Sequence, residues 1–83
     1  MSVENKIFDL ITTLNRIAKK NKDEFAYRIV INQNRTGLEY IFECSENCDG
    51  HPFVTGISDS IEQALDNALL EIDSCCKEWG YKQ

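Results

Sequence analysis

The spacing of apolar residues changes twice along this 83-residue chain, and that change constrains the fold more than any other feature. Near each end, apolar residues recur at steps of three and four, which is typical of a helix with one buried stripe. In the middle they alternate with polar residues, as expected of strands with one buried face. The pattern predicts a helix, a group of strands and a second helix.

The first helix is predicted from about residue 3 to 21 and the last from about residue 59 to 79. Their apolar stripes are Ile7, Leu10, Ile11, Leu14, Ile17 and Ala18, and Ile61, Ala64, Leu65, Ala68, Leu69, Ile72, Cys75, Cys76 and Trp79. Ser2 is a suitable cap for the first helix. Asp59 followed by Glu62 approximates a capping box for the last, and Gly80 stands where that helix is expected to end.

Two strands and a shorter third one are predicted between the helices. Phe25, Tyr27, Ile29 and Ile31 are expected to share one face with Leu38, Tyr40, Phe42 and Cys44. The segment 32–37 contains two asparagines and a glycine, which favour a hairpin turn. Residues 51–56 suffice for a short strand, and Pro52 favours its placement at a sheet edge.

These elements predict one α+β domain over residues 1–83, a two-layer sandwich of order α-β-β-β-α. Each helix has one apolar stripe to bury, so both are expected on the aromatic face of an antiparallel three-stranded sheet. A chain of this size has no room for a second core.

Charge is distributed unevenly along the chain. The net charge is −5, although residues 1–22 hold five basic side chains against two acidic ones. Six acidic side chains and one lysine follow in residues 58–79. An acidic surface repels phosphate backbones, so direct binding to DNA or RNA is not expected.

No apolar run approaches the roughly 20 residues that span a bilayer, and the first residues lack a secretory signal. We therefore expect a cytoplasmic protein that makes no contact with membranes. In that compartment the four cysteines are expected to be reduced thiols.

Neither catalysis nor a cofactor is predicted. His51 is the only histidine available to activate a cysteine, and no third group is placed to orient it. The acidic residues of the last helix are expected on a solvated face, and the four glycines are scattered singly rather than gathered in a phosphate-binding loop.

A metal or thiol module is an alternative interpretation. Cys44, Cys48 and His51 lie close in sequence, and Cys75 or Cys76 would complete a zinc shell, but this spacing provides only one of the two ligand groups of a structural zinc site. Cys44 also falls on the predicted core face, where a thiol packs as a small apolar side chain.

The uncovered face of the predicted sheet is the favoured binding surface for a protein partner. It is expected to carry Ala26, Arg28 and Val30 beside Glu39, Ile41 and Glu43, with Val54 alongside. Asp59, Glu62 and Asp66 of the last helix are candidates for contacts with a basic partner. The same face is also typical of an ordinary solvated sheet, and a second copy of the chain is a further candidate partner.

The element order resembles that of the double-stranded RNA-binding domain, chiefly from Tyr27 to Ile72. In both, two long strands and a shorter one lead, here through Gly56-Ile57-Ser58, into an alanine-containing final helix. That family contacts phosphates with lysines at the start of its last helix. Here the matching stretch is Ser58-Asp59-Ser60-Ile61-Glu62, so no RNA-binding residues are carried over and a degenerate version of the domain is the third interpretation.

In size and charge the chain resembles the inhibitors that phages and mobile elements make against host defence systems, including anti-CRISPR proteins. Some of these present carboxylates where a nuclease expects phosphates. The resemblance implies a non-enzymatic protein that occupies a basic, nucleic-acid-binding surface of its partner.

Overall fold

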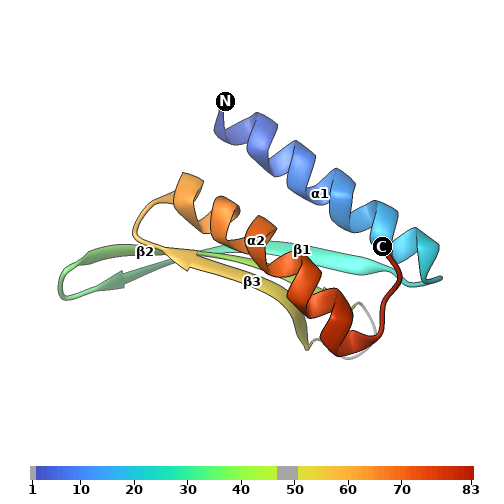
Figure 1. Ribbon diagram of the computed structural model, residues 1–83. Helices are drawn as coiled ribbons and strands as arrows, with labels where there is room; N and C mark the ends of the chain where they lie inside the picture. Colours follow the sequence, from blue (N-terminus) through green and yellow to red (C-terminus); the bar gives the residue numbers. More distant parts are fainter. Residues whose placement is uncertain (1, 47–50) are drawn as a thin grey trace.

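The computed structural model describes residues 2–46 and 51–83, and the predicted order of elements is confirmed (Figure 1). The chain forms α1 (Val3–Lys20), β1 (Phe25–Asn34), β2 (Gly37–Glu46), β3 (Pro52–Ser58) and α2 (Ile61–Trp79). The strands build one antiparallel sheet in the order β1-β2-β3. Both helices lie on the same side of this sheet, so the α+β two-layer class is also confirmed.

No helix in the described part of the chain combines the length and apolar character that crossing a membrane requires.

Both helices begin at a serine cap. The Ser2 hydroxyl accepts a hydrogen bond from the Asn5 amide at 3.2 Å, as predicted. At α2 the cap is Ser60, whose hydroxyl accepts from the Gln63 amide at 3.4 Å, so the predicted capping by Asp59 and Glu62 is wrong. Serine followed three residues later by glutamine has the chemistry of a capping box. Gly80 ends α2 with a left-handed φ of 73°.

The side chains of the β1–β2 hairpin point to the faces of the sheet that the sequence predicted. Pairing of Ile29 with Phe42 and of Ile31 with Tyr40 places these side chains on the face that bears the helices. At the turn, the Asn34 side-chain oxygen accepts hydrogen bonds from the Thr36 amide at 3.0 Å and from its hydroxyl at 2.9 Å. An asparagine side chain that accepts a hydrogen bond from the backbone amide two residues later is a common turn motif.

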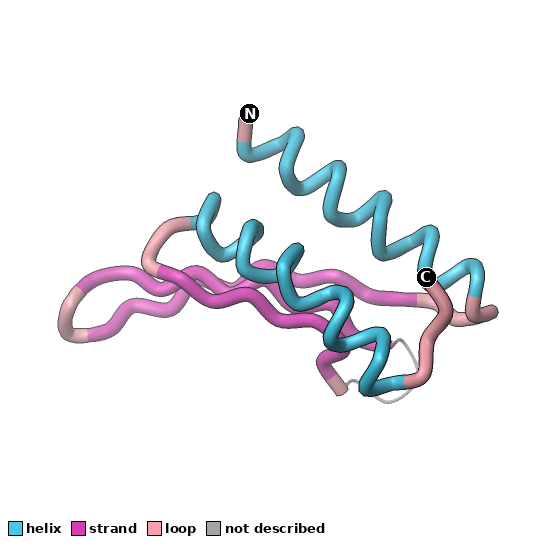
Figure 2. Tube along the Cα trace, viewed as in Figure 1, coloured by secondary structure: helices cyan, strands magenta, loops and turns pink. Residues whose placement is uncertain are grey.

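The helices cover only part of that face. Phe42 and Cys44 are buried, whereas Ile31 is 59% exposed and Leu38 is 47% exposed. The hairpin extends past the ends of the helices, which leaves its far end bare on both sides (Figure 2). Alternation along a strand therefore identified the facing of these residues but not their burial.

A β-bulge changes the phase of β3. The register shifts between Cys44 and Ser45 of β2, and as a result Phe53 and Val54 are both buried although they are neighbours in sequence. Val54 was expected on the uncovered face. That expectation is wrong, because Val54 pairs with Cys44 and is 0% exposed within the core.

The contact between β3 and α2 depends on Gly56. A Cβ atom at this position would lie 2.0 Å from the carbonyl oxygen of Ala64 and 2.6 Å from the amide nitrogen of Ala68. Only a glycine on the strand, facing two alanines on the helix, allows such a close approach. Leu65, Ile72 and Cys76 of α2 consequently reach the same core as Phe42 and Val54, which Leu10, Leu14 and Ile17 of α1 complete.

An aromatic cluster joins the C-terminus to the sheet. The ring of Phe53 lies 5.2 Å from Phe25, 5.3 Å from Trp79 and 5.0 Å from Tyr81, measured between centroids. Tyr81 itself is half-buried. Its hydroxyl is within hydrogen-bond reach of the carboxylates of Asp23 and Glu46, and its hydrogen bond lowers the pKa of Asp23 below the usual 3.8.

Substitution of Gly56 tests the close contact directly. Gly56→Ala should reduce the free energy of unfolding by at least about 2 kcal/mol, because the added Cβ overlaps helix backbone that cannot move aside. Urea unfolding measures this loss. Adding Ala68→Gly to the Gly56→Ala variant should not restore stability, since the added Cβ at position 56 would still lie 2.0 Å from the Ala64 carbonyl oxygen. Full restoration by Ala68→Gly, or wild-type stability of Gly56→Ala, would contradict the assigned contact.

Tyr81→Phe should change how stability depends on pH. Because the pKa of Asp23 is lowered in the folded state, its carboxylate stabilises the fold above pH 3.8, and this contribution is lost as the pH falls through the lower folded value. Without the hydroxyl, the stability should drop by about 1 kcal/mol at neutral pH and decline less as the pH falls below 3.8.

Urea midpoints over that pH range measure the effect. Tyr40→Phe removes the same atom from a half-buried tyrosine whose hydroxyl has no hydrogen bond among the described residues. This control should keep the wild-type acid dependence. An unchanged decline in Tyr81→Phe would mean that the hydrogen bond does not act on Asp23.

Candidate docking surface

The sheet face opposite the helices, here called the open face, brings together five of the predicted binding residues. Arg28 and Val30 belong to β1, while Glu39, Ile41 and Glu43 belong to β2. The register pairs Arg28 with Glu43 and Val30 with Ile41, and Glu39 with Asn32. In Figure 1 no helix lies over this side of the sheet.

An apolar row crosses all three strands at the middle of the open face. Val30 pairs with Ile41, and Ile41 in turn pairs with Ile57 of β3. Ile57 is 50% exposed, and the other two side chains are half-buried. Sequence reasoning missed Ile57 because the predicted third strand stopped at residue 56. The two-residue spacing of Thr55 and Ile57, which places both side chains on one face of a strand, was the signal that would have extended it.

An ion pair borders the apolar row. The Arg28 guanidinium donates to the Glu43 carboxylate from Nη2 at 2.6 Å and from Nε at 3.1 Å. The Arg28 side chain is 69% exposed, and such surface pairs typically contribute about 0–1 kcal/mol to stability. Its main effect is to hold the two side chains in a fixed position across β1 and β2.

A shallow hollow of about 360 Å³ lies next to this ion pair. The residues that line it are Ala26, Tyr27, Arg28, Glu43, Ser45 and Pro52. A charged pair, a serine hydroxyl and small apolar groups suit a protruding polar side chain of a protein partner better than a reacting substrate.

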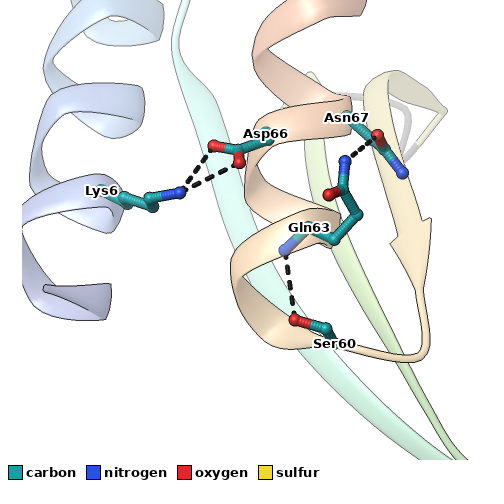
Figure 3. A network of polar contacts seen from close by, with 5 residues as sticks. All are labelled: Lys6, Ser60, Gln63, Asp66 and Asn67. Atoms are coloured by element: carbon teal, nitrogen blue, oxygen red, sulfur yellow. Dashed lines mark hydrogen bonds and ion pairs between the residues drawn. The ribbon is translucent and has the colours of Figure 1, made fainter. Parts of the chain in front are cut away.

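The three acidic candidates of the last helix do not join the open face. Asp59 precedes α2 and Glu62 is exposed in its first turn, in the helical layer on the other side of the sheet. Asp66 already has a partner, because its carboxylate accepts hydrogen bonds from the Lys6 ammonium of α1 at 3.0 Å (Figure 3). The predicted binding residues therefore fall on two separate surfaces.

The three cysteine residues that the structure describes lie in the core or pack against it. Cys44 is fully buried, and burial raises the pKa of its thiol to about 12. Burial likewise raises the pKa of the Cys75 and Cys76 thiols. A thiol that acts as a nucleophile or metal ligand needs a lowered pKa, so these shifts favour structural thiols.

The alternative metal ligands are only partly described. Cys48 lies outside the described residues, and His51 is exposed. Within residues 2–46 and 51–83, no group of three His, Cys, Asp or Glu side chains could hold a metal ion. Of the two cysteines in α2, Cys76 is the one that belongs to the buried core.

Comparison with known proteins adds no family to this description. Protein-family models, curated proteins and solved structures were each searched, and none gave a significant match.

Proposed function

We propose that the chain is a non-enzymatic interaction module that docks on a protein partner through the open face of its sheet. The apolar row of Val30, Ile41 and Ile57 carries this proposal. Apolar side chains in register across three strands form a flat central contact, and charged side chains at their border suit the polar rim of an interface.

Charge supports a basic partner surface. Glu39 and Glu43 border the apolar row, and Arg28 neutralises only Glu43 among the described residues. The chain as a whole carries a net charge of −5, and α2 contributes five acidic side chains against one lysine. An acidic module attracts a basic surface from a distance, which raises the association rate and makes it sensitive to salt.

A basic surface of a cytoplasmic protein commonly binds nucleic acid, because lysine and arginine displace the counterions of phosphates. A chain that occupies such a surface excludes DNA or RNA without any catalysis. We therefore favour an inhibitor of a nucleic-acid-handling protein, of the kind that phages and mobile elements direct against host defence.

Affinity capture with matched variants tests this function. Tagged wild-type chain incubated with bacterial lysate at low salt should retain a basic protein and release it as salt is raised. Ile57→Asp should abolish this capture, because it places a charge on the most exposed residue of the apolar row. The retained protein should also bind less nucleic acid when the chain is added.

Leu69→Asp is the matched control, since Leu69 is as exposed as Ile57 but lies on α2 in the helical layer. It should keep the capture. Equal loss in both variants, or capture that does not respond to salt, would argue against docking through the open face.

A further inference from the structure

The free edge of β3 and the adjoining side of α2 form a second groove, which shares Ile57 with the open face. Among the described residues β3 pairs only with β2, so it is an edge strand. The groove has a volume of about 450 Å³, and its lining consists of Phe53, Thr55, Gly56 and Ile57 from β3 with Asn67, Leu70, Glu71 and Cys75 from α2. The close contact at Gly56 places the helix wall directly beside the strand.

One backbone group at this edge is already capped by a side chain. The Asn67 amide donates a hydrogen bond to the Ile57 carbonyl oxygen at 3.0 Å. Asn67 is itself held by Gln63, whose amide donates to the Asn67 side-chain oxygen at 2.9 Å (Figure 3). The Asn67 amide thus stands where the N–H of a neighbouring strand would stand.

The rest of the edge is available for pairing. Because alternate residues of a strand direct their backbone groups to the same edge, Thr55 presents its N–H and C=O beside the Ile57 carbonyl. No turn, cap or loop hydrogen bond among the described residues uses these Thr55 groups. An exposed row of this kind is the template on which an added strand forms.

The helix wall determines which side chains such a strand needs. Leu70 is 77% exposed, the highest value among the large apolar side chains of the described residues. Glu71 is the one charged residue of the groove lining, and Glu78 adds a second negative charge close to Cys75. The wall therefore combines an uncovered apolar side chain with negative charge.

We infer that this groove binds an extended peptide segment by strand addition to β3. Side chains two residues apart on the added strand point to the same face, so one apolar side chain covers Leu70 and a lysine or arginine two residues along pairs with Glu71. A second copy of the chain does not meet this requirement, because a symmetric pairing of β3 edges would bring Glu71 and Glu78 against the same acidic residues.

A peptide of seven residues serves as the probe, with threonine at odd positions and valine, lysine and valine at the even ones. Titration into the isotope-labelled full chain should shift the NMR signals of Thr55, Ile57 and Leu70 and slow solvent exchange of the Thr55 amide. Replacing the lysine of the peptide by glutamate should weaken binding by about tenfold.

Variants of the chain separate the helix wall from the strand edge. Leu70→Ser and Glu71→Lys should each weaken binding by about tenfold, and Leu69→Ser, on the other side of α2, should not. Thr55→Pro removes the outward N–H and should abolish binding. Glu71→Lys should also gain affinity for the glutamate peptide, which a misfolded variant would not do.

Three results would overturn the inference: no binding at millimolar peptide, equal binding by Leu70→Ser and wild type, or shifts confined to β1 or to the open face. Ile57 belongs to both surfaces, whereas Leu70 lies only in the groove. Leu70→Ser should therefore keep the capture from lysate, so failure of one surface is distinguishable from failure of the other.

Discussion

The approach of α2 to β3 at Gly56 is the constraint on which the rest of the structure depends. With a Cβ position only 2.0 Å from the Ala64 carbonyl oxygen, strand and helix are nearly in backbone contact. This closeness brings Leu65, Ile72 and Cys76 into the core and gives α1 a surface on which Leu10 and Leu14 pack. It also forms one wall of the groove along the free edge of β3.

For function, the most important feature is that the helices cover only one face of the sheet. An 83-residue chain with two helices covers one face of a three-stranded sheet and leaves the other to solvent. The helices are also shorter than the hairpin, so Ile31 and Leu38 stay exposed even on the covered side. These exposed apolar residues on a small acidic protein are the observation from which the docking function is proposed.

Hydrophobic periodicity predicted all five elements and the facing of β1 and β2, because both depend on local sequence and on burial of one side. It did not predict the position of Val54, since a bulge in β3 arises from pairing with β2 and leaves no signal in the alternation itself. The choice of Ser60 over Asp59 as helix cap was equally hidden, because both residues are good caps.

Part of the candidate surface was also predictable from alternation along the strands. Alternation placed Arg28, Val30, Glu39, Ile41 and Glu43 on one face, and pairing added Ile57. Asp66 was offered as a partner contact, yet its bond to Lys6 joins residues 60 positions apart, which no local pattern reveals. Likewise, the groove between β3 and α2 exists only after the helix has packed on the strand.

Methyl NMR with a soluble paramagnetic relaxation agent tests the central claim, that one face of the sheet is covered and the other is open. The agent should strongly broaden the methyl signals of Ile57, reach those of Val30 and Ile41 to a lesser degree, and leave those of Val54 unaffected. Equal protection of Ile57 and Val54 in the free chain would contradict the account, because it would mean that the open face is covered in solution.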